Sequence, residues 1–319
     1  MSFKREALRN ELPLVTWLLP VRNGMPFLTD TLRSVAEQQY PRQRIIAWDN
    51  GSTDGTQAEL RRWIPGRIDG EVIDDRPLRL GECRANLVER ATSEICACTD
   101  ADDISHPDRL MRQVHRLLDS PSLVAIGAVP NIIDEHGRPL PDWYYPLDNA
   151  EIRWRTRWQA SLNASSVTFR RSAVLAAGNY RNLDLSQDLD LWIRLSRIGG
   201  MQNLSERLIS YRRHTNNLTA GVVDYFRYDR EIAVLNADAL FPGYNAGEAL
   251  TLWDIAYPRV ASAKVRLSDI FQLRRTAIRA ARAVGEPDRY FTGTAFFRRQ
   301  VRYMLYNWTR DKLHLTRPT

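Results

Sequence analysis

Four short apolar runs, each the length of a β-strand, alternate with amphipathic stretches in the first part of this chain. The runs are residues 14–21, 44–48, 71–74 and 95–98. Apolar residues at helical spacing follow the first three runs, over about 26–39, around Leu60 and Trp63, and over 82–91. This alternation is typical of a parallel sheet with right-handed helical crossovers. We therefore expect an α/β fold with a mostly parallel, Rossmann-like sheet and flanking helices.

Further elements are expected after the fourth run. Pro107 is suited to the first position of a helix, with Ser105 or His106 as its N-cap, because proline lacks the N–H group that a first helical residue leaves unpaired. Additional strands are expected at residues 123–129, 165–169 and 207–213, and a short helix at 172–177.

An acidic segment follows the fourth run and contains Asp100, Asp102 and Asp103. Residues two apart in extended backbone point the same way, so Asp100 and Asp102 can converge on one point. Two carboxylates held together repel unless a cation or protons lie between them. Mg²⁺ or Mn²⁺ is the natural cation, because both bind phosphate oxygens alongside one or two carboxylates. The alternative is a solvated acidic turn.

Two strand ends frame the acidic site. Asp49 ends the second strand and Asp100 follows the fourth, so both are expected at the carboxyl edge of the sheet, where ligands bind in open α/β folds. Asp49 is placed to accept from a nucleobase N–H or a ribose hydroxyl; the alternative is a turn residue that caps the next helix. Neither of the usual glycine-rich phosphate loops is present, so a metal would hold the phosphates.

Composition and charge limit the possible domain organisation and cellular location. The 319 residues suffice for one large domain with an appendage, and the three cysteines fit buried thiols better than a zinc site or disulfides, which favours the cytosol. No signal peptide or membrane span is evident. Residues 1–224 carry 29 basic and 29 acidic side chains, whereas residues 225–319 carry 16 and 9. We expect a catalytic domain over 1–224 and a basic helical region over 225–319.

The basic region contains two amphipathic stretches, residues 268–284 and 296–308, in which arginines alternate with an apolar stripe. One interpretation is peripheral docking on an anionic membrane surface, where lipid-linked acceptors reside. The other is a pair of helices packed on the catalytic domain with solvated arginines. Charge alone would also permit nucleic-acid binding, but no motif that reads nucleic acid is present.

Residues 18–24, 46–56 and 99–103 resemble, in order and spacing, the motifs of family 2 glycosyltransferases of the GT-A fold. The resemblance covers roughly residues 12–220, and the tail has no counterpart that we can identify. It implies a nucleotide-diphosphate sugar donor, UDP favoured over GDP, a divalent metal (Mn²⁺ or Mg²⁺) and inversion at the anomeric carbon. One departure is Asn50, where many relatives carry Asp.

The resemblance also implies roles for individual residues. Asp49 would contact the base, Asp100 would face the ribose and diphosphate, and Asp102 would be the main metal ligand. The full set of implied donor-binding residues is Pro20, Val21, Asn23, Asp49, Arg79, Asp100 and Ala101.

A helix is expected over residues 187–195, with Ser186 as its cap. Asp188 and Asp190 lie about 200° apart around its axis, so only one can face the site. Asp188 is in the first turn, where the helix dipole keeps a carboxylate ionised, and an ionised Asp can act as a general base. The segment resembles the family's Glu-Asp-x-Asp-Leu-Trp motif, with Gln187 in place of Glu, and the family's base matches Asp188.

Residues 211–214 follow the family's closing Tyr-Arg-x-His pattern. His214 is a candidate metal ligand or diphosphate contact, or a structural histidine. Arg212 or Arg213 could neutralise the leaving diphosphate. The aromatic residues Trp143, Tyr144, Tyr145, Trp154 and Trp158 could stack on sugars or simply fill a core.

The sequence therefore predicts an inverting, metal-dependent transfer of one sugar to an acceptor hydroxyl, in bacterial surface polysaccharide or glycoconjugate assembly. The processive synthases' Gln-x-x-Arg-Trp motif and their membrane helices are absent from this sequence. Two alternatives are a nucleotidylyltransferase and a non-catalytic protein that binds sugar nucleotides or a surface on the same scaffold.

Overall fold

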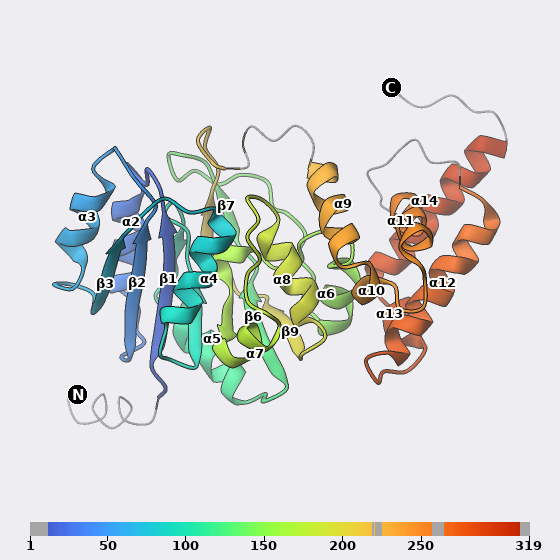
Figure 1. The fold of residues 1–319 in the computed structure, drawn as a ribbon, viewed down its shortest axis with the longest axis horizontal. Coiled ribbons are helices and arrows are strands. Elements are labelled where there is room, and N and C mark those ends of the chain that lie inside the picture. Colours follow the sequence, from blue (N-terminus) through green and yellow to red (C-terminus); the bar gives the residue numbers. More distant parts are fainter. Residues whose placement is uncertain (1–11, 219, 221–224, 257–264, 313–319) are drawn as a thin grey trace.

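The computed structural model describes residues 12–218, 220, 225–256 and 265–312 of the chain. Its main feature is a seven-stranded sheet in the order β3-β2-β1-β4-β8-β6-β9 (Figure 1). The strands are β1 (Val15–Val21), β2 (Gln43–Asp49), β3 (Gly70–Asp74), β4 (Ile95–Cys98), β6 (Leu123–Ala128), β8 (Thr168–Arg170) and β9 (Gly200–Leu204).

The first four strands are parallel, as the alternating pattern predicts. In the register, Val21 of β1 lies beside Asp49 of β2, and Leu18 lies beside Cys98 of β4. All four residues of β4 are buried, as expected for a strand covered on both faces. The carboxyl ends of β1, β2 and β4 therefore share one edge. Asp49, the last residue of β2, and Asp100, in the loop after β4, both lie there.

Helices connect these strands and cover both faces of the sheet. They are α2 (Leu28–Ala36), α3 (Thr56–Trp63), α4 (Leu80–Arg90), α5 (Arg109–Leu118), α6 (Asn149–Arg155), the 3₁₀ turn η1 (Ala164–Ser166), α7 (Arg171–Ala176) and α8 (Gln187–Leu195). Successive side chains of β1 enter different cores: Leu18 packs in a cluster with α4 and α8, and Trp17 in a cluster with α2 and α5.

One strand of the second half, β8, departs from the parallel arrangement. β8 pairs antiparallel with both β4 and β6, and β9 pairs parallel with β6. The strand expected at residues 165–169 is shorter than predicted, because residues 164–166 form the turn η1 before β8 begins.

A second, three-stranded sheet lies beside the first, in the order β5-β10-β7. It contains β5 (Ile104–Ser105), β7 (Asn131–Ile133) and β10 (Ile209–Arg212). The predicted helix start at Ser105 or His106 is wrong, because Ser105 belongs to β5 and the helix begins at Arg109 after Asp108. The pairing of Ser105 with Ile209 overrides the local helix signal. The first helix likewise begins at Leu28, after Pro26.

The C-terminal part is helical. Figure 1 shows its last helices gathered at the end of the molecule away from β3. The helices are α9 (Tyr225–Leu235), α10 (Ala237–Leu240), α11 (Ala246–Ala256), α12 (Leu267–Arg282), α13 (Arg289–Thr292) and α14 (Ala295–Lys312). The helices expected at 268–284 and 296–308 are confirmed as α12 and α14. The division at residue 224 stays a prediction, and residues 221–224 lie outside the described residues.

A third core joins these helices to the first half of the chain. Trp154 of α6 and Leu189 of α8 pack in one cluster with Trp253 of α11, Leu273 of α12 and Phe291 of α13. Side chains also bond across this junction: the Trp154 indole donates to Gln300 Oε1 at 2.8 Å, and the Trp253 indole to the Arg157 carbonyl at 2.8 Å. The apolar stripes of α12 and α14 are thus largely used inside the protein.

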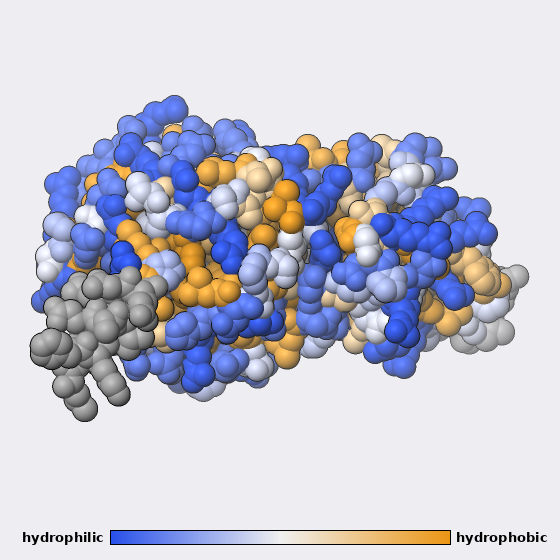
Figure 2. Space-filling view, turned by 90° about the horizontal axis from the view of Figure 1, so that it is seen from below, coloured by the Kyte–Doolittle hydropathy of each residue, from blue (hydrophilic) through white to orange (hydrophobic). Residues whose placement is uncertain are grey.

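The outer surface of this region is largely polar, although some apolar side chains, such as Phe271 and Leu305, are exposed on it. Figure 2 shows hydrophilic side chains over much of the C-terminal end, with smaller apolar groups between them. Arg274 and Arg275 of α12 are among the exposed residues. Within the described ranges, no helix combines the length and the apolarity needed to cross a membrane.

We expect Trp154→Ala to lower the free energy of unfolding by about 3–5 kcal/mol, because it empties a fully buried site at the junction. Trp143→Ala, at a side chain that is 43% exposed, should cost less than about 1 kcal/mol. Urea unfolding of both variants measures the difference. Equal losses would contradict the assignment of Trp154 to the core.

Candidate functional site

The loops after β1 and β2 are locked together at the carboxyl edge. Asn23 adopts φ 52°, a left-handed conformation that Asn tolerates, and its side-chain oxygen accepts from the Thr53 amide at 2.9 Å. The Met25 amide donates to Asp54 at 2.9 Å. The side chain of Asn23, an implied donor-binding residue, therefore holds the second loop in place.

Asp49 lies at the end of β2 and is only 2% exposed. One carboxylate oxygen accepts from the Ser52 amide at 3.1 Å, which shapes the turn after the strand. On the neighbouring strand β1, Pro20 is partly buried and Val21 is buried. Asp49 thus forms the turn named in the alternative, but the first amide of α3 is bonded by Asp54 and not by Asp49. The contact of Asp49 with a base stays a prediction.

Asn50 clamps a second loop to the same edge. Its amide nitrogen donates to the Leu78 carbonyl at 2.8 Å, and its oxygen accepts from the Leu78 amide at 2.6 Å. This two-way contact needs an amide, because a carboxylate cannot donate. It places Arg79 at the start of α4, where the guanidinium is 61% exposed and lies 3.7 Å from Asp184.

Asp100 forms an ion pair with Arg84 of α4 at 2.8 Å. The Arg84 side chain is 7% exposed and lies over the Tyr180 ring. Burial alone would lower the pKa of Arg84, but the nearby charges, led by Asp100 and including Asp188, raise it above its usual value. Arg84 was missed by sequence reasoning; its signal is an arginine on the buried face of α4, beside Cys83 and Leu87.

Asp102 has different partners. Its Oδ2 lies 3.0 Å from His214 Nε2 and accepts from the Asn217 amide nitrogen at 2.8 Å. The His214 ring packs beside Phe27, with centroids 4.6 Å apart. The structure brings together the two predicted metal ligands, Asp102 and His214. Asp100, which was expected to converge with Asp102, pairs with Arg84 instead. The neighbouring Ala101 is partly buried.

No group of three or more His, Cys, Asp and Glu side chains that could hold a metal ion occurs among the residues that the structure describes. A carboxylate and an imidazole are nonetheless a donor set that suits Mn²⁺, which takes its remaining ligands from phosphate oxygens and water. The residues present therefore fit a cation that is bound jointly with a substrate.

Asp103 is the structural member of the acidic segment. It is fully buried, and it accepts from the Ser165 hydroxyl and from the Arg212 amide, the latter at 2.9 Å. Burial raises the pKa of Asp103 well above its usual value. These contacts tie the acidic segment to η1 and to β10.

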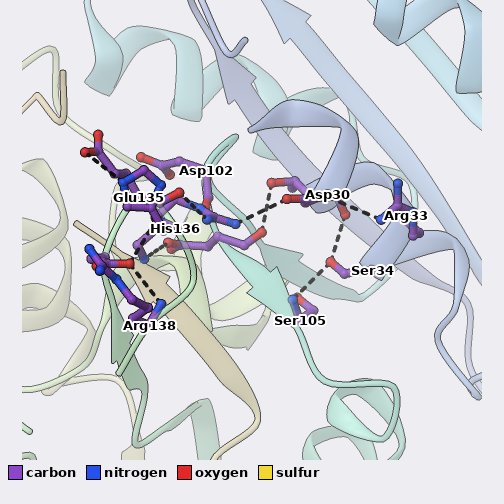
Figure 3. A network of polar contacts seen from close by, with 12 residues as sticks. Asp30, Arg33, Ser34, Asp102, Ser105, Glu135, His136 and Arg138 are labelled. Atoms are coloured by element: carbon purple, nitrogen blue, oxygen red, sulfur yellow. Dashed lines mark hydrogen bonds and ion pairs between the residues drawn. The ribbon is translucent and has the colours of Figure 1, made fainter. Parts of the chain in front are cut away.

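Arg212 continues this connection. Its guanidinium donates to the carbonyls of Asp102 and Glu135 and reaches the carboxylate of Asp30 on α2 at 3.4 Å (Figure 3). Only 4% of Arg212 is exposed. Since this arginine is occupied inside the protein, Arg213, which is exposed and lies over the Trp143 ring, is the freer of the two for a diphosphate.

Helix α8 presents one carboxylate to the site, as the helical spacing predicts. Asp190 is fully buried between Arg181 at 2.8 Å and Arg194 at 2.6 Å. Asp188 is partly exposed in the first turn, and its charge acts on Arg84 and Asp100. The expected cap differs in detail: Ser186 precedes the helix with φ 55°, but its side chain makes no capping bond.

The aromatic candidates separate into two groups. Trp154 and Trp158 are fully buried and belong to the core, so the core interpretation is correct for them. Trp143 and Tyr144 are exposed, and Trp143 packs against Tyr211 of β10 with ring centroids 5.8 Å apart. Of these five aromatic residues, therefore, Trp143, Tyr144 and the partly buried Tyr145 are the ones that a ligand can reach.

Sequence comparison places this chain among known proteins. The sequence model described as Glycosyl transferase family 2 matches residues 16–176. The amylovoran biosynthesis glycosyltransferase AmsE of Erwinia amylovora is 30% identical over 190 residues, which are 58% of this chain and 70% of AmsE. The putative teichuronic acid biosynthesis glycosyltransferase TuaG of Bacillus subtilis is 24% identical over 67% of this chain and 84% of TuaG.

Solved structures share the fold. TarS 1-349 of S. aureus, in complex with UDP-GlcNAc, matches with a TM-score of 0.64 and 14% identity, over 96% of this chain and 93% of that one. The mannosyltransferase PcManGT of Pyrobaculum calidifontis, in complex with GDP-Man and Mn²⁺, matches with a TM-score of 0.53 and 18% identity, over 96% and 89%. Such coverage extends into the C-terminal helices, for which the sequence showed no counterpart.

We expect Asn50→Asp to lower the free energy of unfolding by about 1–3 kcal/mol, because a carboxylate oxygen would face the Leu78 carbonyl where the amide now donates. Asn216→Asp, at an exposed position in another loop, is the matched control and should have little effect. Urea unfolding compares the two. An unchanged Asn50→Asp protein would show that the clamp is dispensable.

Proposed function

The chain belongs to glycosyl transferase family 2, and we propose that it transfers one sugar from a nucleotide-diphosphate sugar to an acceptor hydroxyl, with inversion at the anomeric carbon. The observation that carries the proposal is the arrangement at the carboxyl edge of the sheet. There Asp102 with His214, and Asp100 paired to Arg84, lie near Asp188 of α8, whose charge acts on Asp100. The family match over residues 16–176 supports it.

The donor would lie across the ends of β1, β2 and β4. Asp49 and the loops that Asn23 and Asn50 hold supply a polar wall for the nucleoside. UDP is the favoured nucleotide, and the TarS complexes with UDP-GlcNAc and UDP support that choice. The PcManGT complex with GDP-Man makes GDP the first alternative.

Asp102 and His214 would hold a divalent cation, Mn²⁺ or Mg²⁺, when one is bound. Such a cation would supply positive charge to the diphosphate as the bond to the sugar breaks. The chain's own contribution is positional: Asn217 donates to Asp102, and Phe27 supports the His214 ring, so both side chains are already oriented.

Asp188 is the proposed general base. It would take the proton of the acceptor hydroxyl while that oxygen attacks the anomeric carbon from the face opposite the diphosphate, and the carbon–oxygen bond to the diphosphate breaks. It lies in the first turn of α8 and is partly exposed, so an acceptor hydroxyl can reach the carboxylate. Asp190 is unsuited to this role because two arginines enclose it.

The names of the relatives support a role in bacterial surface polysaccharide assembly, since AmsE is named for amylovoran and TuaG for teichuronic acid biosynthesis. Single-sugar transfer is part of the proposal. Peripheral contact of the basic helices with a membrane stays a prediction. Leu273 and Met304 are buried, whereas Phe271 and Leu305 are exposed together with several arginines of α12 and α14.

We expect one nucleotide, UDP first, to bind in the presence of Mn²⁺ when UDP, GDP and dTDP are titrated by calorimetry. Asp102→Ala should weaken that binding by at least about tenfold, since it removes the carboxylate of the donor set. Asp119→Ala, at an exposed position after α5, is the control. Absence of binding to all three nucleotides would favour a non-catalytic protein.

We expect Asp188→Asn to reduce turnover by about 10²–10⁴-fold with nucleotide affinity unchanged, because it removes the proton acceptor alone. Turnover is measured as nucleoside diphosphate release in the presence of donor and acceptor, with Asp119→Asn as the control. Full activity of Asp188→Asn would refute the base assignment. Release of pyrophosphate from a nucleoside triphosphate would instead identify a nucleotidylyltransferase.

A further inference from the structure

A cavity of about 420 Å³ lies outside the site described above, between α6, the segment that precedes it, and α14. Tyr144 and Glu151 line it on the catalytic side. Helix α14 contributes Phe296, Arg298, Arg299 and Arg302. We call it the arginine pocket. It exists only because the C-terminal helices pack on α6.

The charge of the arginine pocket is positive and unbalanced. Arg298, Arg299 and Arg302 are exposed, and none of the ion pairs found in the described part of the chain involves them. Among the residues that the structure describes, the Arg298 guanidinium donates to the Gly293 carbonyl alone, at 2.6 Å. The one carboxylate in the lining is Glu151, which accepts from the Tyr144 hydroxyl at 2.8 Å.

A fourth arginine, Arg155, lies beside the pocket. Its guanidinium is 5.3 Å from the centre of the Tyr144 ring and donates to the Tyr144 carbonyl at 2.7 Å. Burial lowers the pKa of Arg155 to about 10, and the charge of Arg299 acts in the same direction. Like charges held this close together raise the affinity of a site for an anion.

The aromatic walls add a second property. The guanidinium carbon of Arg299 lies over two aromatic rings, 5.0 Å from the Phe296 ring centre and 6.0 Å from that of Tyr144, which is a cation–π arrangement. Tyr144 itself is 52% exposed. An aromatic face beside guanidinium donors suits a sugar ring that carries an anionic group, because the ring can stack while the anion accepts paired hydrogen bonds.

The arginine pocket is connected to the candidate active site through residues 143–145. Tyr144 lines the pocket. The charges of Arg155 and Asp188 both act on the next residue, Tyr145. The preceding residue, Trp143, packs on Tyr211 and Arg213, which lead to His214. A molecule that fills the pocket can therefore extend past Tyr145 toward the proposed base.

We propose that the arginine pocket is an acceptor subsite that binds an anionic group, a carboxylate or a phosphate, on the acceptor saccharide. The assignment to the acceptor rests on the proposed function; the binding of an anionic sugar does not. A concave pocket with the exposed Tyr144 ring at its wall favours a group that projects into it, such as a substituent on a sugar, over the flat array of a membrane surface.

The test is calorimetric titration of the full chain with glucose 6-phosphate, glucuronate and glucose, with UDP and Mn²⁺ present in excess so that the donor site is filled. The two anionic sugars should bind more tightly than glucose. Arg299→Gln/Arg302→Gln should weaken their binding about tenfold or more. Arg274→Gln/Arg275→Gln removes the same charge from exposed positions on α12 and should leave binding unchanged.

A second variant keeps the test independent of misfolding. Glu151→Gln preserves an acceptor for the Tyr144 hydroxyl and removes the only carboxylate of the pocket lining. It should tighten binding of the anionic sugars about three- to tenfold, since a repulsive charge is lost. A gain of affinity cannot arise from a damaged fold. Equal binding of glucose and the anionic sugars, or equal losses in both double variants, would overturn the proposal.

Co-sedimentation with anionic and neutral phospholipid vesicles tests whether the pocket binds the phosphate of a lipid headgroup instead of an anionic saccharide. Binding to anionic vesicles that Arg299→Gln/Arg302→Gln abolishes, without binding of either anionic sugar, would assign the pocket to lipid headgroups and overturn the saccharide assignment. If the anionic sugars bind although no nucleotide does, the pocket stands as a binding site and the proposed transferase function fails.

Discussion

The site depends on the hydrogen bonds that the buried carboxylate of Asp103 accepts. This carboxylate joins the exit of β4 to η1 through the Ser165 hydroxyl and to β10 through the Arg212 amide. A buried carboxylate is costly unless its oxygens are bonded, so these two contacts leave the acidic segment little choice of position. With Asp103 held in place, Asp100 meets Arg84 and Asp102 meets His214. Asp103 therefore orients the side chains of Asp100 and Asp102 without needing a ligand contact of its own.

Arg212 extends the same constraint to α2. It bonds two carbonyls and Asp30, and its guanidinium lies over the Phe27 ring, whose other neighbour is His214. The small sheet is therefore more than an appendage, since β10 carries both the arginine that braces the acidic segment and the approach to His214. This explains why β5 replaces the expected helix start: the chain at Ile104 and Ser105 must pair with β10.

The C-terminal helices serve the first half in two ways. Their apolar residues complete a core with Trp154 and Leu189, which steadies the helices α6 and α8 on which Glu151 and Asp188 lie. Their arginines, which the apolar packing leaves outside, gather beside Tyr144. Part of the positive charge of residues 225–319 thus lies in the arginine pocket, for which we propose the acceptor role.

The sequence by itself determined the parallel sheet and the carboxyl edge, because each strand and its helix are encoded by neighbouring residues with a clear period. It also separated Asp188 from Asp190, since helical spacing alone puts them on different faces. The tertiary structure decided the partners. These hydrogen-bond partners lie 16 to 115 positions away in the sequence, and no local pattern selects them. They are Arg84 for Asp100, Asn217 for Asp102 and Leu78 for Asn50. The arginine pocket belongs to the same class, because α6 and α14 meet only when Trp154 and Gln300, 146 positions apart, are buried together.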